Sequence, residues 1–349
     1  MRVVVTGATG NVGTSVVAAL VADPGVDEVV GLARRTPAAL GAGVEFVQAD
    51  VVDSDLVKIF SGADAVVHLA WLIQPGRDES VTSRVNLRGC ERVFEAVADA
   101  GVGTLVYASS VGAYSPGPKD HLVDESWPTD GIPTSFYSRH KANVERMLNR
   151  FEADHPRTRV VRMRPGLIFK REAATEIRRL FIGPFLPRAL LRSQLFPFSP
   201  AVDGLRFQAV QCDDVGDAYR RAVVGDVRGP FNLAAEPVIG ASELAEMLNA
   251  RPVKVSPRVL RAGASASFGL RLQPAEPGWL DMALKVPLMS TARAREELGW
   301  SPRVSATEAI VELMHGMREA ADAPTPPLAG ATSGPARLRE VVTGLGKRQ

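Results

Sequence analysis

The sequence predicts an α/β protein built on a doubly wound parallel sheet. Three observations support this: a β-branched run that enters a glycine-rich turn and then a helix over about 2–22, an alternation of strand-like and helix-like segments up to about residue 166, and an uninterrupted apolar run at 65–70. Such an apolar run is typical of a parallel strand that is covered on both faces. Because βαβ units have right-handed crossovers, ligands are expected outside the carboxyl ends of the strands.

The opening turn is the first candidate for a ligand site. Gly7, Gly10 and Gly13 directly follow the apolar run at 3–5. Gly7 allows unusual backbone angles, Gly10 lets a pyrophosphate approach the backbone, and Gly13 lets the helix pack closely on the strand. The free N–H groups of the helix then face the phosphates. The spacing G-x-x-G-x-x-G differs from the common dinucleotide fingerprint, and a plain strand-to-helix turn would use the same glycines.

The second strand, at about 27–35, indicates which dinucleotide is preferred. It ends in Ala33, Arg34 and Arg35. An acidic residue at this strand end accepts a hydrogen bond from the ribose 2′-OH of NAD, whereas an arginine accommodates the 2′-phosphate of NADP. Since Ala33 takes the place of the acid, we expect NADP, with NAD as the alternative. The competing interpretation is that both arginines lie in a solvated loop.

Bulk composition excludes several classes of protein. The chain has 349 residues, of which 46% are apolar and 23% charged, as in ordinary globular domains. A net charge of +2 gives no sign of a nucleic-acid partner. Cys90 and Cys212 form no disulfide framework, and no cluster has metal-ligand spacing, so no metal is expected. No apolar run is long enough for a membrane span, and the first strand begins at Arg2; we expect a cytoplasmic protein with a small-molecule substrate.

A strand at 104–109 and a helix at 135–148 are predicted to supply an acid–base group. Tyr137 and Lys141 are four residues apart, so they project from one face of the helix. A phenol has a pKa of about 10 and transfers protons poorly near neutrality, but the Lys141 cation favours the phenolate and is suited to hold a nicotinamide ribose. Ser110, at the carboxyl end of its strand, would hold a substrate oxygen against Tyr137. The alternative is a simple surface pair.

Beyond Gly166 the alternation weakens. We expect a dinucleotide-binding domain at 1–166, to which a segment at about 205–235 returns, a substrate domain or cap at 167–319, and a mobile tail at 320–349. The cap contains an apolar set that suits a hydrophobic substrate: Leu180, Phe181, Ile182, Phe185, Leu186, Leu190, Leu191, Leu195, Phe196 and Phe198. The same residues would also suit a core or a dimer contact. Nearby arginines would suit a phosphate: Arg178, Arg179, Arg188 and Arg192.

Motifs in family order give the chain a clear resemblance over about 1–318. They are Thr6-Gly7-Ala8-Thr9-Gly10-Asn11-Val12-Gly13, Asp50-Val51, His68-Leu69-Ala70, Asn86, Ser109-Ser110 with Tyr114, Tyr137-Ser138-Arg139-His140-Lys141, Arg164-Pro165-Gly166, Asp213-Asp214-Val215, Phe231-Asn232-Leu233 and Leu298-Gly299-Trp300-Ser301-Pro302. The chain resembles an extended short-chain dehydrogenase/reductase of the NAD-dependent epimerase/dehydratase type. This resemblance implies a Rossmann-type domain with a smaller C-terminal substrate-binding domain, and commonly a homodimer.

The resemblance also implies roles for individual residues. Ser110, Tyr137 and Lys141 would be catalytic, and Asn86 would support Lys141. The implied cofactor contacts are Gly7, Gly10, Asn11, Val12 and Gly13 at the pyrophosphate, Arg34 at the 2′-phosphate, Asp50 and Val51 at the adenine, Leu69 and Ala70 at the adenosine ribose, and Tyr137, Lys141 and Pro165 near the nicotinamide. One departure concerns the substrate: Leu167 stands where nucleotide-sugar enzymes of this superfamily usually carry an asparagine.

Three functions follow as hypotheses. The first is an NAD(P)-dependent oxidoreductase that transfers hydride between nicotinamide and a carbonyl or alcohol of a largely apolar small molecule, with Tyr137 as acid/base. The second is a nucleotide-sugar epimerase or dehydratase with transient oxidation, which would consume no cofactor in net turnover. The third is a non-catalytic sensor of the cofactor. Intact Ser110, Tyr137 and Lys141 disfavour the sensor, because sensing needs no activated tyrosine.

Overall fold

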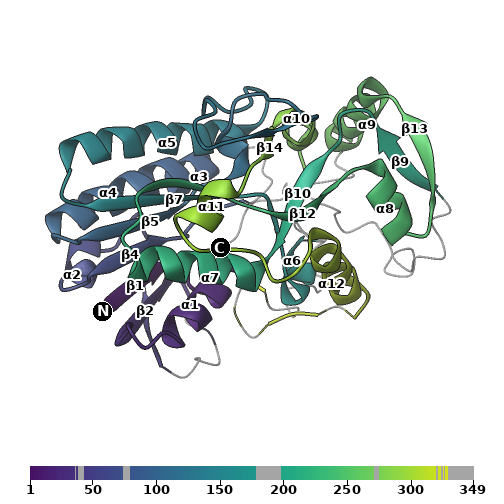
Figure 1. The fold of residues 1–349 in the computed structure, drawn as a ribbon. Coiled ribbons are helices and arrows are strands. Elements are labelled where there is room, and N and C mark those ends of the chain that lie inside the picture. The colour runs from purple at the N-terminus through teal and green to yellow at the C-terminus, as the bar shows by residue number, and fades with distance from the viewer. Residues whose placement is uncertain are drawn as a thin grey trace.

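A seven-stranded parallel sheet lies at the centre of the molecule (Figure 1). The computed structural model describes residues 1–35, 37, 43–73, 79–177, 198–270, 275–319, 321–323, 325, 327 and 328. Across the sheet the strands are β3 (Val44–Gln48), β2 (Glu28–Ala33), β1 (Arg2–Thr6), β4 (Ala65–His68), β5 (Thr104–Ala108), β7 (Arg159–Pro165) and β11 (Gly229–Leu233). All neighbouring strands are parallel, so the predicted fold class is confirmed.

Helices cover both faces of this sheet (Figure 1). One face packs on α1 (Asn11–Val21) and α7 (Cys212–Val224), the other on α2 (Leu56–Phe60), α4 (Gly89–Asp99) and α5 (Phe136–Asp154). Val3 and Val5 belong to the first apolar core and Val4 to the second, as the two-residue period of a strand requires. Before α4, α3 (Glu79–Ser83) continues into a π-helical turn, η1 (Arg84–Arg88).

The later part of the chain forms smaller sheets beside the main one. The strands are β6 (Leu122–Val123) with β14 (Leu288–Met289); β8 (Leu167–Phe169) with β10 (Phe207–Gln211) and β12 (Ala235–Ile239); and β9 (Phe198–Val202) with β13 (Arg251–Val255). The helices are α6 (Ala174–Ile177), α8 (Ala241–Met247), α9 (Pro257–Gly269), α10 (Pro277–Lys285), α11 (Ala292–Glu296) and α12 (Ala306–Glu319), with 3₁₀ turns η2 (Val111–Ala113) and η3 (Arg171–Ala173).

The segment expected to return to the first domain divides between the two parts. Strand β11 joins the main sheet, whereas β10 lies in the small sheet with β8 and β12. The division of the chain into domains stays a prediction. The apolar cap residues from Leu180 to Phe196, the four arginines between 178 and 192, and nearly all of the 320–349 tail lie outside the described residues. Phe198, the remaining cap residue, is 60% exposed on β9.

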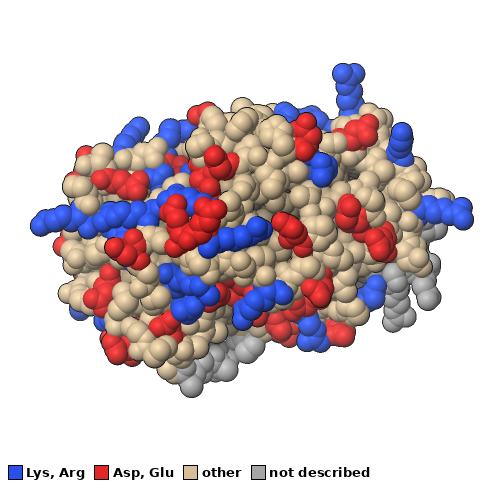
Figure 2. All heavy atoms as spheres, viewed as in Figure 1, with Lys and Arg blue, Asp and Glu red and all other residues tan. Residues whose placement is uncertain are grey.

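Positive and negative side chains intermingle on the face that Figure 2 shows, which fits the small net charge. In the described ranges no group of His, Cys, Asp and Glu has an arrangement that would hold a metal ion. The helices in those ranges also include none with the length and apolarity that a membrane crossing demands.

The strand order opens a crevice in the sheet. Strand β1 lies between β2 and β4. After β1 the chain adds β2 and β3 on one side of it, and then crosses over to add β4 and β5 on the other side. At such a switch point the connections after two adjacent strands diverge, and the carboxyl ends of the strands are left accessible to a ligand. The fold therefore places the site at the ends of β1, β2, β4 and β5.

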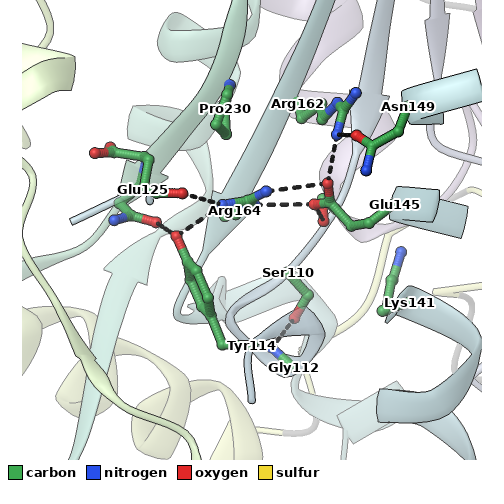
Figure 3. A network of polar contacts seen from close by, with 12 residues as sticks. Ser110, Gly112, Tyr114, Glu125, Lys141, Glu145, Asn149, Arg162, Arg164 and Pro230 are labelled. Carbon is green, nitrogen blue, oxygen red and sulfur yellow. Dashed lines mark hydrogen bonds and ion pairs between the residues drawn. The ribbon is translucent and has the colours of Figure 1, made fainter. Parts of the chain in front are cut away.

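A buried ion-pair network ties α5 to β7 (Figure 3). The carboxylate of Glu145, on α5 and fully buried, accepts hydrogen bonds from Arg164 Nε at 2.9 Å and from Arg162 Nη1 at 3.0 Å. It also accepts one from Ser109 Oγ at 2.5 Å, beyond the end of β5. Burial by itself raises the pKa of this carboxyl, but Arg164, Arg162 and Ser109 outweigh it and lower the pKa to about 2.

Arg164 continues the network toward the small sheets. Its Nη1 donates to the Tyr114 hydroxyl at 3.0 Å and to the Glu125 carbonyl at 2.9 Å, and the Tyr114 hydroxyl donates to Asn232 Oδ1 at 2.7 Å (Figure 3). The network thus joins α5, β7 and β11 with the loop that follows β5.

This network predicts a large cost for removing one guanidinium. Arg164→Met leaves Glu145 buried with incomplete compensation, so we expect a loss of about 3–5 kcal/mol in the free energy of unfolding. Urea unfolding measures this loss of stability. The control is Arg84→Met, which removes an arginine from an exposed ion pair with Asp53, and it should cost less than about 1 kcal/mol.

The same loss should depend on pH. The pKa of Glu145 is lower in the folded protein than in the unfolded chain. The ionised carboxylate therefore adds to the free energy of unfolding above the unfolded pKa of about 4.3, and this contribution disappears as the pH falls toward about 2. The stability difference between the wild type and Arg164→Met should therefore narrow over this interval. A loss as small as that of Arg84→Met at neutral pH would contradict the structural role of Glu145.

Candidate active site

A cavity of about 600 Å³ opens at the carboxyl ends of the strands. Every residue predicted for the site lines it, with the exception of Asn86. Those residues are Gly7, Gly10, Asn11, Val12, Gly13, Arg34, Asp50, Val51, Leu69, Ala70, Ser110, Tyr137, Lys141 and Pro165. Residues that the motifs place far apart in the sequence thus share one cavity.

The glycine turn forms a cradle that only glycine permits. Gly7 has a φ of +72°, and a Cβ on Gly13 would lie 2.2 Å from the Gly7 carbonyl oxygen. Asn11 starts α1, whose first turn contains no acidic residue, so the positive end of the helix dipole is not neutralised there. Asn11 Oδ1 is buried with no hydrogen-bond partner among the described residues. A pyrophosphate fits the approachable backbone and the free N–H groups of this cradle, whereas the unpartnered Asn11 Oδ1 accepts hydrogen bonds and so suits a donor, not a phosphate oxygen.

Polar groups after β2 and β3 border the next part of the cavity. Arg34 and Arg35 both line it, and Gln48 Nε2 donates to the Arg34 carbonyl oxygen at 3.1 Å. Asp50 Oδ1 accepts from Val52 N at 2.8 Å, which fixes the turn after β3. The arginines therefore lie at the cavity rather than away from it.

His68 lies behind the cavity as a core side chain. Its Nδ1 is 2.7 Å from Thr6 Oγ1, and its Nε2 is 3.2 Å from the sulfur of Cys90. Burial lowers the pKa of His68 to about 3, so the ring is neutral. Thr6 Oγ1 also accepts from Ala70 N at 3.2 Å, which fixes the backbone at the end of β4. His68 is therefore a buried, hydrogen-bonded core side chain.

Tyr137 and Lys141 form the acid–base end of the cavity. Lys141 is 3% exposed, and its Nζ donates to the Ala108 carbonyl oxygen at 2.6 Å. Burial lowers the pKa of Lys141 to about 7. Burial also raises the pKa of the Tyr137 phenol to about 12, while a hydrogen bond with the Ser110 side chain opposes this shift. Both shifts are of the kind that marks functional sites.

Ser110 is fixed against α5 through Gly112. Ser110 Oγ accepts from Gly112 N at 3.0 Å, and the Gly112 carbonyl accepts from Ser138 Oγ at 2.5 Å. A Cβ on Gly112 would lie 2.8 Å from the Tyr137 ring. The absence of that atom lets the loop carrying Ser110 approach Tyr137 closely.

Asn86 does not line the cavity but supports its wall. It is fully buried in the π-helical turn, where its Oδ1 accepts from Leu72 N at 2.8 Å and its Nδ2 donates to Leu72 O at 3.0 Å. The resemblance assigned Asn86 to the support of Lys141; the described hydrogen bonds go to Leu72 instead, and through it they fix the segment after β4.

Aromatic residues around Tyr137 are the part of the site that sequence analysis missed. Trp279 packs on the Tyr137 ring with centroids 4.9 Å apart, and Trp71 meets it edge-on at 6.0 Å. Trp71 directly follows Ala70 at a strand end, which was a usable signal. Trp279 comes from α10, far along the chain and outside any motif, so no local sequence pattern predicts that it lies at the site.

Comparisons with known proteins agree with this geometry. A model of the NAD dependent epimerase/dehydratase family matches residues 3–203. A UDP-glucose 4-epimerase of Mycolicibacterium smegmatis is 28% identical over 91% of this chain and 99% of that protein. A decarboxylating sterol-4-alpha-carboxylate 3-dehydrogenase of Saccharomyces cerevisiae is 25% identical over 74% of this chain and 78% of that protein.

Two further comparisons concern the length of the relatives and the fold of a solved structure. The chain spans 30% of the length of uncharacterised proteins of Mycobacterium bovis and Mycobacterium tuberculosis that are 28% identical to it. The crystal structure of a Thermus thermophilus UDP-glucose 4-epimerase in complex with NAD has the same fold, with a TM-score of 0.67, 24% identity, and coverage of 92% of this chain and 100% of that one. The chain belongs to the NAD-dependent epimerase/dehydratase family.

Proposed function

We propose that the protein is an NAD(P)(H)-dependent oxidoreductase that interconverts a carbonyl and an alcohol in a largely apolar small molecule. The observation that carries this proposal is the convergence of Ser110, Tyr137 and Lys141 at one end of a cavity whose other end is the glycine cradle. A dinucleotide held by the cradle would reach the acid–base group within this single cavity.

The cavity residues fit the cofactor part by part. Gly7, Gly10, Asn11, Val12 and Gly13 would hold the pyrophosphate, Asp50 and Val51 the adenine, Leu69 and Ala70 the adenosine ribose, and Pro165 the nicotinamide. Arg34 would pair with a 2′-phosphate, so NADP is the preferred form. When bound, the nicotinamide supplies or accepts the hydride.

Tyr137 is suited to give or take the proton. With a pKa of about 12 the phenol is protonated at neutral pH, so in the reducing direction it donates to the substrate carbonyl oxygen. Ser110 would donate a hydrogen bond to the same oxygen and hold it at Tyr137. Lys141, when charged, would stabilise the phenolate that remains. Its pKa of about 7 leaves it partly protonated near neutrality.

The walls near Tyr137 support an apolar substrate. Val111, Leu167, Trp279 and Met282 line this end. The similarity to a sterol-4-alpha-carboxylate 3-dehydrogenase is consistent with this choice.

A nucleotide-sugar epimerase or dehydratase is the second candidate. The observation in its favour is the similarity to a UDP-glucose 4-epimerase over nearly the whole length of that protein. Leu167, in the place of the usual asparagine, is an observation against it. A homodimer and a cytoplasmic location stay predictions of the resemblance and composition.

Cofactor choice is testable by calorimetric titration with NADPH and NADH in parallel. We expect tighter binding of NADPH, and a loss of about 10-fold or more in Arg34→Ala with NADH binding unchanged, because a charge-assisted hydrogen bond contributes about 1.5–3 kcal/mol. Arg84→Ala, a surface arginine outside the cavity, is the control. Equal or tighter NADH binding by the wild type would make the NADP assignment wrong.

The proposed reaction is testable by NADPH oxidation with a panel of apolar ketones and aldehydes, against UDP-glucose as the epimerase substrate. We expect net consumption of NADPH with a carbonyl, and a drop in kcat of about 10²–10⁴-fold in Tyr137→Phe because general acid–base catalysis is removed. Cofactor affinity should persist in this variant. Turnover of UDP-glucose without net cofactor use would favour the epimerase, and full activity in Tyr137→Phe would refute the role of Tyr137.

A further inference from the structure

Trp71 packs against both Lys141 and Tyr137, the two members of the acid–base pair. It follows Ala70 beyond the carboxyl end of β4 and lines the cavity. The Nζ of Lys141 lies over the indole at 3.5 Å from the ring centroid. The same indole meets the Tyr137 ring in a T-shaped contact, with an interplanar angle of 79°. One side chain therefore contacts both Lys141 and Tyr137.

The ammonium of Lys141 faces no uncompensated anion in the described part of the chain. On α5, the Glu145 carboxylate is paired with Arg162 and Arg164, and the Tyr137 phenol is neutral. The remaining ionisable neighbours are all uncharged at neutral pH: Cys90 on α4, whose pKa burial raises to about 12; Tyr107 on β5, whose pKa burial raises; and His68 on β4, whose pKa burial lowers to about 3. The ammonium donates to the Ala108 carbonyl and lies over three aromatic rings, at 3.5 Å from the centroid of Trp71, 5.1 Å from that of Tyr107 and 5.8 Å from that of Tyr137. The indole of Trp71 is the nearest of the three.

The backbone around Trp71 is held on both sides. Ala70 N donates to Thr6 Oγ1 at 3.2 Å, and both backbone groups of Leu72 pair with Asn86. The indole is thus placed by anchored neighbours, so its position over Lys141 is preorganised. This gives the buried Asn86 a role at the site that does not require contact with Lys141.

We propose that Trp71 is a positioning residue whose indole face holds the Lys141 ammonium in place and keeps it charged, while its edge fixes the ring of Tyr137. The proposal rests on the proposed function only in assigning Lys141 and Tyr137 to catalysis. Tryptophan is the strongest aromatic partner for a cation, and the interaction is stronger where water is excluded, as it is for Lys141, which is 3% exposed.

The first test is independent of activity. NMR of protein labelled with ¹³C at the lysine ε-carbon gives the chemical shift and the pKa of Lys141, with Lys141→Met to assign the signal. In the wild type we expect an upfield shift of this signal, because the Nζ bonded to this carbon lies 3.5 Å from the centroid of the indole ring. In Trp71→Leu we expect this shift to disappear and the pKa of Lys141 to fall by about one unit.

Two variants control this measurement. Trp71→Phe keeps an aromatic face and should restore most of the shift and of the pKa. Should Trp71→Leu fail to fold, Trp71→Met replaces it as the variant without an aromatic face. Trp127→Leu removes a tryptophan that packs near Tyr114 and Met289 outside the cavity, and it should leave both quantities unchanged. An unchanged shift and an unchanged pKa of Lys141 in folded Trp71→Leu would overturn the proposal, whatever the enzyme turns over.

A kinetic measurement separates the positioning role from a structural one. With less charge on Lys141, the Tyr137 phenolate forms at higher pH, so the rise of kcat/KM for alcohol oxidation with pH should move upward by up to about one unit in Trp71→Leu. Trp71→Phe should return the profile toward that of the wild type. A uniform loss of rate with an unshifted profile would contradict the proposal, whereas absence of turnover in the wild type would count against the proposed function alone.

Discussion

The pairing of Glu145 with two arginines is the interaction on which the site depends. A fully buried carboxylate is tolerated only where opposite charges and hydrogen bonds compensate it, and here both arginines come from β7. The pairing fixes where α5 lies on the sheet. Tyr137, Lys141 and Glu145 are spaced four residues apart, so they follow one stripe of the helix, and fixing Glu145 orients the other two toward the cavity.

Exclusion of water gives the acid–base end its chemical character. Burial moves the pKa of Lys141 down and that of Tyr137 up. The cavity thus combines the glycine cradle, suited to an anion, with aromatic walls around Tyr137. An extended dinucleotide that spans the cavity would bring its nicotinamide ring to Tyr137.

Local pattern predicted much of this structure. The apolar runs, the glycine spacing and the four-residue spacing of Tyr137 and Lys141 are short-range signals. The apolar runs form the strands of the main sheet, and the glycines, Tyr137 and Lys141 line the cavity at the carboxyl ends of those strands. Long-range strand pairings could not be predicted. Strand β10 joins β8 and β12 because its side chains pack there, and the sequence of a strand does not indicate which other strand it pairs with. The hydrogen bonds of Asn86 to Leu72 and the stacking of Trp279 on Tyr137 likewise depend on tertiary packing.

A crystal structure of the protein with bound NADPH would show directly whether this cavity holds the dinucleotide. We expect the pyrophosphate on the backbone of Gly10 and Asn11, and the nicotinamide beside Tyr137 and Lys141, with space for one small molecule between the ring and the Tyr137 hydroxyl. A dinucleotide bound elsewhere, or one whose nicotinamide lies away from Tyr137, would contradict the claim that this cavity is the site of hydride transfer.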